Sequence, residues 1–83
     1  MNQSVIKALG ILDLFIDDKE LSLQEIAEKS GIPKPTAYRL LSTLENSGML
    51  YKVKENPHDS RYGLGLKLLE LGNLVSERLE LRE

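Results

Sequence analysis

Two short helix patterns, separated by a break of three to four residues, constrain the fold of this chain more than any other feature. Ser22 opens the first pattern, and either Pro33 or Pro35 opens the second. Gly31 lies in the break, where glycine can take the positive φ of a tight turn without steric cost. The apolar residues around the break recur at the spacing that lets two helices touch: Ala27, Ile32, Ala37 and Leu40. The sequence therefore predicts two helices packed across a tight turn.

This layout is a helix-turn-helix, the unit that places its second helix in the major groove of DNA. The start of the first helix is marked twice. Ser22 and Glu25 have the spacing of a capping box, and Leu21 and Ile26 flank them as a hydrophobic staple. We expect this helix to begin at or just after Ser22.

The second helix of the motif, the expected recognition helix, spans 33–47. Proline is tolerated in its first turn, because the N–H groups there lack partners within the helix. Its buried face consists of Ala37, Leu40, Leu41 and Leu44. Gly48 is placed to end the helix in the left-handed conformation, with Met49 packing back on Leu44.

Another helix is predicted on each side of the motif. In residues 4–16 apolar side chains recur at helical spacing, at Val5, Leu9, Leu12 and Ile16, with Ala8, Ile11 and Phe15 widening the stripe. We expect this first helix to lie largely in the core. The C-terminal helix begins at Leu66. We expect Leu66, Leu68 and Leu69 to lie in the core, and Val75 and Leu79 to lie at an interdomain or dimer surface.

Residues 50–64 predict a β-hairpin, or wing. Residues 50–54 alternate apolar and basic side chains, residues 55–60 have turn chemistry, and residues 61–64 can return as a second strand. The expected fold class is therefore mainly α with a small β-hairpin. It is a winged helix-turn-helix with a three-helix core, a wing and a C-terminal linker helix. Residues 1–65 form the first unit and residues 66–83 the linker helix.

Size and composition favour a binding module over an enzyme. A chain of 83 residues buries too little surface for a large enclosed active site. It has no cysteine, and its single histidine, His58, lacks the partners of a metal or nucleophile site, so we expect no catalytic residue, metal or cofactor. The N-terminus lacks signal-peptide character, and no apolar run is long enough to cross a membrane. We therefore expect a cytoplasmic protein.

The net charge of −2 argues against nucleic acid, but the distribution of charge favours it. Residues 1–33 carry three Lys against six acidic residues, residues 34–62 carry five basic against three acidic, and residues 63–83 carry three against four. Positive charge is thus concentrated in the expected recognition helix and wing. The excess is modest, so we do not expect tight binding by a single copy.

The polar face of the recognition helix holds the candidate DNA contacts Lys34, Thr36, Tyr38, Arg39, Ser42 and Thr43, and the wing adds Lys54 and Arg61, with Lys52 beside them. Arginine is the commonest reader of guanine, whereas the alternative is a solvated Arg39 that bridges to Glu45 or another acidic residue. Thr36 could instead be the N-cap, and Tyr38 could cover the edge of the core. A strand lysine could simply protect an exposed sheet edge.

Taken together, these elements resemble the N-terminal domain of the IclR (isocitrate lyase regulator) family. The residues that carry the resemblance are 23–27, 31–41, Leu44, Gly48, 61–65 and 68–72, and the match extends over nearly the whole chain. Pro35 departs from the family, which more often has a serine there. The resemblance implies a homodimeric or tetrameric regulator that binds double-stranded operator DNA, with a separate C-terminal domain, absent from this chain, that senses a small molecule.

Two functions of different classes remain open at this point. The first is sequence-specific binding of double-stranded DNA, with helix 33–47 in the major groove and wing 50–64 on the backbone. The second is a winged-helix module for protein–protein interaction, which the same fold can host and which the acidic composition suits. Salt-dependent binding to duplex DNA separates them.

Overall fold

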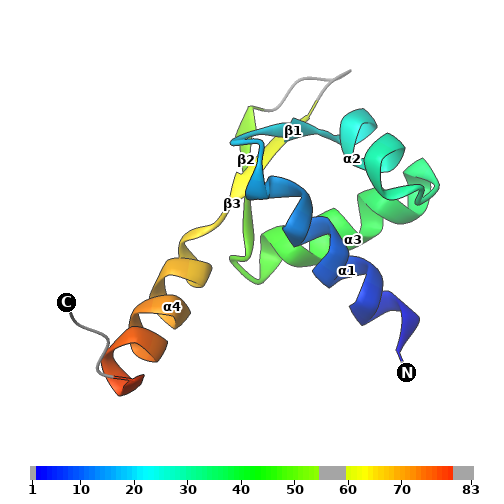
Figure 1. Cartoon of the computed structure of the whole chain (residues 1–83). Coiled ribbons are helices and arrows are strands. Elements are labelled where there is room, and N and C mark those ends of the chain that lie inside the picture. The colour runs from blue at the N-terminus through cyan, green and yellow to red at the C-terminus, as the bar shows by residue number, and fades with distance from the viewer. Residues whose placement is uncertain (1, 55–59, 80–83) are drawn as a thin grey trace.

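The computed structural model describes residues 2–54 and 60–79. Its elements are α1 (Gln3–Asp13), the 3-10 helix η1 (Leu14–Ile16), β1 (Leu21–Ser22), α2 (Leu23–Ser30), α3 (Lys34–Asn46), β2 (Leu50–Lys54), β3 (Arg61–Leu64) and α4 (Leu66–Leu79). Helices α1, α2 and α3 pack beside a small antiparallel sheet, and α4 projects away from them (Figure 1). This is the predicted winged helix-turn-helix. Within the described residues, no helix has both the length and the apolar character needed to cross a membrane.

The predicted hairpin is present, but the sheet has a third strand that the sequence did not predict. The strand order is β1-β3-β2, and β1 pairs Leu21 with Tyr62 and Ser22 with Arg61. A strand of two residues is too short to show alternation, and its partner lies far along the chain. The β2–β3 register shifts between Lys52 and Lys54. The predicted turn chemistry at 55–59, including His58, lies outside the described residues.

The helix ends form as predicted. The Ser22 N–H donates to Glu25 Oε1 at 2.8 Å, and the Glu25 N–H donates to Ser22 Oγ at 3.1 Å, so the capping box is complete. Gly31 ends α2 with φ of +74°. Helix α3 begins at Lys34 with Pro33 as its N-cap, which settles the choice between the two prolines.

The C-terminal end of α3 is also the predicted one. Gly48 has φ of +86°, in the left-handed region. The Met49 N–H donates to the Leu44 carbonyl at 2.9 Å and the Gly48 N–H to the Glu45 carbonyl at 3.0 Å. These two bonds form a Schellman motif, which satisfies carbonyls left unpaired at a helix end.

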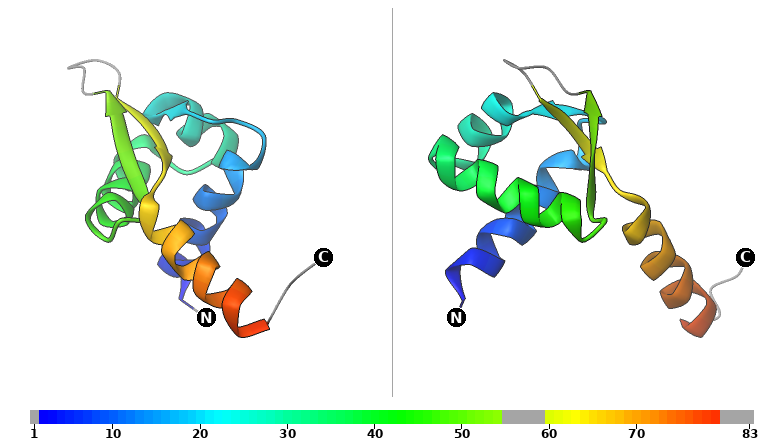
Figure 2. Two further views of the ribbon diagram at one scale, coloured as in Figure 1. Left: turned by 90° about the vertical axis from the view of Figure 1, so that its left-hand side faces the viewer. Right: turned by 180° about the vertical axis from the view of Figure 1, so that it is seen from behind.

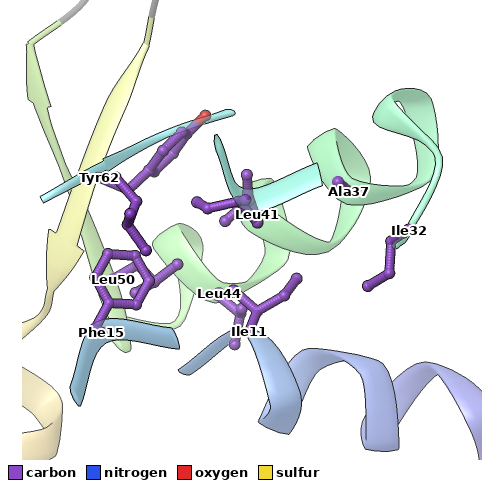
Figure 3. Packing of buried hydrophobic residues seen from close by; sticks show 10 residues of the cluster. Ile11, Phe15, Ile32, Ala37, Leu41, Leu44, Leu50 and Tyr62 are labelled. Carbon is purple, nitrogen blue, oxygen red and sulfur yellow. The ribbon is translucent and has the colours of Figure 1, made fainter. Parts of the chain in front are cut away.

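The core lies between α1, the helix-turn-helix and the sheet (Figure 3). It consists of Ile11, Phe15, Leu21, Ile26, Ile32, Ala37, Leu41, Leu44, Leu50 and Tyr62. Ala37, Leu41 and Leu44 come from the predicted buried face of α3, whose fourth member, Leu40, is half-buried. Packing one face of α3 inward fixes the direction of its opposite face.

The expectation that the first helix lies largely in the core is confirmed for Ile11 and Phe15 and in part for Leu12, but it is wrong for Val5, Leu9 and Ile16. Val5, Leu9 and Ile16 are 51%, 57% and 78% exposed, whereas Ile11 and Phe15 are buried. Apolar residues surround most of this helix, so periodicity alone could not tell which of its two stripes faces inward. The exposed stripe runs the length of α1 and η1.

The core positions predicted at the start of α4 are also wrong. Leu66 and Leu69 are 67% and 57% exposed, and only Leu68 is half-buried. Figure 1 shows the reason, since α4 leaves the body directly after β3 and no other element covers it. Val75 and Leu79 are exposed, at 54% and 63%.

Candidate nucleic-acid interface

The outward face of α3 is a polar helix surface that lies opposite the buried residues Ala37, Leu41 and Leu44. In the view from behind, α3 lies in front of α1 with no element over it (Figure 2). The six predicted contact residues all lie outside the buried core: Lys34, Tyr38, Arg39 and Thr43 are exposed, and Thr36 and Ser42 are half-buried. The structure therefore brings these six residues together on one helix.

The cations of this face, Lys34 and Arg39, form no ion pair with another described residue. Helix α3 contains one acidic residue, Glu45, and its carboxylate lies 3.9 Å from Lys52 Nζ on strand β2. Within the described part of the chain, neither Lys34 nor Arg39 has a carboxylate oxygen within 4.0 Å. Glu45 pairs with Lys52 and not with Arg39, so the alternative of an Arg39–Glu45 bridge is not what the structure shows.

The N-terminus of α3 is open to an anion. Pro33 is the N-cap, and among the described residues no side chain accepts from the first turn. Thr36 is the third residue of the helix, so it is not the N-cap that was the alternative for it. The positive end of the helix dipole and free N–H groups favour negative charge, and Lys34 adds a cation at the same end.

The remaining α3 candidates differ in how free their polar groups are. Tyr38 is 49% exposed, so much of its ring faces outward. Thr43 Oγ1 donates to the Arg39 carbonyl at 3.2 Å, which leaves that hydroxyl only its acceptor capacity. Arg39 and Thr43 also line a groove of about 390 Å³ that runs between α3 and the start of α1, where Asn2 caps α1 through the Val5 N–H.

The wing cations have partners within the protein. Lys52, whose side chain is 19% exposed, pairs with Glu45 and lies 5.8 Å from the centre of the Tyr62 ring. Arg61 Nε lies 3.5 Å from Glu20 Oε1, and its Nη2 lies 3.9 Å from Glu25 Oε1. These contacts tie the wing to the body. Lys54 is the last residue of β2, and its side chain lies outside the described residues.

Two ionisable groups in the wing's surroundings are perturbed. The pKa of Glu25 is lowered, chiefly by the hydrogen bond from the Ser22 backbone and further by Arg61. Burial raises the pKa of the Tyr62 hydroxyl. Both groups hold structure in place: Glu25 at the start of α2, and Tyr62 in the core. In the part of the chain that the structure describes, no group of three His, Cys, Asp or Glu residues could hold a metal ion.

Sequence reasoning missed one polar residue on this face. Asn46 is exposed in the last turn of α3, four residues after Ser42 and seven after Arg39. Residues at these spacings share a helix face, so the signal that could have found Asn46 was present in the sequence.

Comparison with known proteins assigns the same segment to one family. The sequence pattern of the IclR helix-turn-helix domain matches residues 4–54. The HTH-type transcriptional regulator KipR of Bacillus subtilis is 37% identical over 82 residues, which cover 99% of this chain and 31% of KipR. The regulator XynR of Escherichia coli is 39% identical over 82 residues, covering 98% of this chain and 31% of XynR.

Solved structures agree with the sequence relatives. An IclR family transcriptional regulator from Brucella abortus has a TM-score of 0.80 at 32% identity, over 95% of this chain and 29% of that one. The chain thus spans about a third of the length of these relatives. The family pattern covers residues 4–54, and the relatives and the solved structure cover nearly the whole chain. The chain therefore belongs to the IclR family and contains that family's helix-turn-helix domain.

Proposed function

We propose that this chain binds double-stranded operator DNA in a sequence-specific manner as part of a transcriptional regulator. The observation that carries the proposal is the outward face of α3, where Lys34 and Arg39 are exposed and no carboxylate among the described residues lies within 4.0 Å of either. Such a face suits the major groove, which is lined by phosphates and by base edges that arginine recognises. The residues proposed to enter the groove are Lys34, Thr36, Tyr38, Arg39, Ser42 and Thr43.

Within this proposal, the residues have different tasks. Lys34 and the open N-terminus of α3 bind a phosphate, because charge and free N–H groups coincide there. Arg39, in the middle of the outward face, reads a base edge or a second phosphate. In the wing, Lys54 and Arg61 are proposed to contact the DNA backbone. Arg61 would do so while its guanidinium remains close to Glu20 and Glu25.

We also propose that the chain acts as a homodimer, so that two copies read two half-sites. Two largely exposed apolar stripes support this. One consists of Val5, Leu9, Leu12 and Ile16, and the other of Leu68, Leu71, Val75 and Leu79; Leu12 and Leu68 are half-buried and the others exposed. Both repeat at steps of three and four residues, the spacing with which helices pair along a seam. A second copy supplies the matching stripes.

A further part of the proposal concerns the complete protein. Because the chain spans 31% of KipR and of XynR, we propose that an effector-binding domain belongs to the complete protein and senses a small molecule. Such a regulator would act in the cytoplasm, where bacterial DNA is found.

Selection of duplexes from a random pool, followed by titration at several salt concentrations, tests the proposal. We expect one sequence family to be enriched, and the logarithm of its affinity to fall linearly with the logarithm of salt concentration, because bound Lys and Arg release counterions. Failure to enrich any duplex, or an affinity independent of salt, would contradict DNA binding and favour a protein-interaction module.

A further inference from the structure

Helix α4 starts directly against the turn that ends α3. Gly65 N–H, one residue before α4, donates to the Met49 carbonyl at 2.8 Å. Lys67 N–H, in the first turn of α4, donates to the Gly48 carbonyl at 3.2 Å. Gly48 belongs to the Schellman motif of α3, so the first turn of α4 is bonded to the last turn of α3. Figure 1 shows the two elements meeting at this point.

Only glycine fits at position 65. A Cβ built there would overlap the Gly48 carbonyl oxygen and would lie 2.9 Å from the carbonyl carbons of Gly48 and Met49. These are backbone atoms, which cannot rotate away as a flexible side chain can. Any side chain at position 65 must therefore push α4 away from the end of α3. Gly65 is buried, although the helix that follows it has no buried residue.

This junction sets the direction of α4. No residue of α4 is buried and only Leu68 is half-buried, so packing of its side chains against the body constrains its direction little. What holds it is the connection from β3 and the two backbone hydrogen bonds to Met49 and Gly48. Because one of those bonds ends on the Gly48 carbonyl, the direction of α4 is fixed relative to α3 itself.

We propose that Gly65 is a positioning residue that sets the distance between the two DNA half-sites which a dimer can bind. This inference rests on the proposed function. In the dimer proposed above, α4 is one of the elements that join the copies. The two α3 helices are then connected to each other through the Gly48–Gly65 contact of each copy. A rigid contact gives one separation of the two recognition helices, and a displaced α4 gives several.

The test uses the duplex selected by the parent chain and a series in which its half-sites are moved apart or together by single base pairs. The parent should prefer one spacing sharply. Gly65→Ala should keep binding to a duplex with a single half-site, while its preference between spacings falls by about tenfold or more. Gly10→Ala is the matched control, because it makes the same substitution at a glycine whose Cβ position is open. This variant should keep the parent's preference.

A distance measurement without DNA tests the junction separately. The chain has no cysteine, so spin labels can be attached through Asn46→Cys on α3 and Asn73→Cys on α4. Labelled chain is diluted with unlabelled chain, so that only distances within one copy are measured. The parent should give one narrow distance distribution, and Gly65→Ala a broadened or displaced one.

A second variant covers the case in which Gly65→Ala does not fold. Lys67→Pro removes the N–H that bonds Gly48, and proline is acceptable in the first turn of a helix, as Pro35 shows in α3. It should broaden the distances and weaken the spacing preference in the same way. Unchanged distances and an unchanged spacing preference in a folded variant would overturn the inference. If the parent bound no duplex, DNA binding would fail, whereas the distance measurement would still decide whether the junction fixes α4.

Discussion

The Glu45 carboxylate of α3 lies 3.9 Å from Lys52 Nζ on β2, so the acidic residue of this helix faces the wing. The contact has two effects. It removes negative charge from the outward face of α3, and it occupies a lysine that the sequence placed among the candidate wing contacts. Lys52 and Arg61 thus have acidic partners, whereas no carboxylate among the described residues lies within 4.0 Å of Lys34 or Arg39.

This division predicts different salt behaviour for two lysines. Lys34→Met should reduce the slope of log affinity against log salt by about one unit, because a phosphate contact is lost. Lys52→Met should leave the slope unchanged, because that lysine is paired with Glu45. Titration of the selected duplex at several salt concentrations measures both. A slope that falls equally in the two variants would show that Lys52 also contacts phosphate.

Two glycines should respond to substitution with opposite signs. Gly31 has φ of +74°, so Gly31→Val should lower the melting temperature, because a β-branched residue strongly disfavours that conformation. Gly10 lies inside α1, and its Cβ position is open, so Gly10→Ala should stabilise by about 0.5–1 kcal/mol. Thermal unfolding of the two variants checks the pair. A Gly31→Val variant as stable as the parent would be incompatible with this turn.

Glu25 should make stability depend on pH. Its pKa is lowered in the folded chain, so its charged form stabilises the fold above the ordinary glutamate pKa of about 4.3, and this contribution is lost as pH falls through the lowered value. Glutamine can still accept from the Ser22 N–H, so Glu25→Gln isolates the charge. We expect the variant to melt below the parent at pH 7 and the difference to be smaller at pH 3. A difference of the same size at both pH values would mean that the charge is not its cause.

The helix-turn-helix could be predicted from sequence because its signals are local. Ser22 and Glu25 are three residues apart, and Gly31 and Gly48 lie at helix ends, where left-handed backbone is needed. Helix bounds follow from such short-range chemistry. The expected span of 33–47 therefore differs from the observed Lys34–Asn46 by a single residue at each end.

The predictions that were wrong concern features that depend on contacts between distant segments of the chain. The choice of Ile11 over Leu9 as the inward residue of α1 depends on where α3 and the sheet lie. The pairing of Leu21 with Tyr62 depends on how β3 returns. For the candidate site, the sequence predicted correctly that the six α3 residues lie outside the buried core. It could not show that Lys52 and Arg61 have acidic partners, because Glu45 and Glu20 approach them only in the folded chain.

The apolar stripes predict self-association. Leu9 is 57% exposed and Val75 is 54% exposed, so Leu9→Lys and Val75→Lys should leave the fold of one copy intact. Each should shift the chain from dimer to monomer and weaken binding to a two-half-site duplex. Sedimentation equilibrium measures the first effect, with circular dichroism as the check on folding. A parent chain that remains monomeric at high concentration would contradict the dimer.

The central claim is that the outward face of α3 reads DNA, and Arg39→Ala tests it most directly. Arg39 is exposed and has no carboxylate within 4.0 Å among the described residues, so its loss should not disturb the fold. The measurement is the affinity of the folded variant for the selected duplex, and for duplexes with single base changes, at several salt concentrations. Arg78→Ala, which removes an exposed arginine from α4, is the control.

We expect Arg39→Ala to lose about 1–3 kcal/mol and to relax the preference at one position of each half-site if the guanidinium contacts a base. If it contacts phosphate, the loss should be uniform across sequences, and the salt slope should fall by about one unit per site. Either result supports α3 as the reading helix. An Arg39→Ala variant that binds the selected duplex as tightly as the parent, with the same preferences and the same salt slope, would contradict the account.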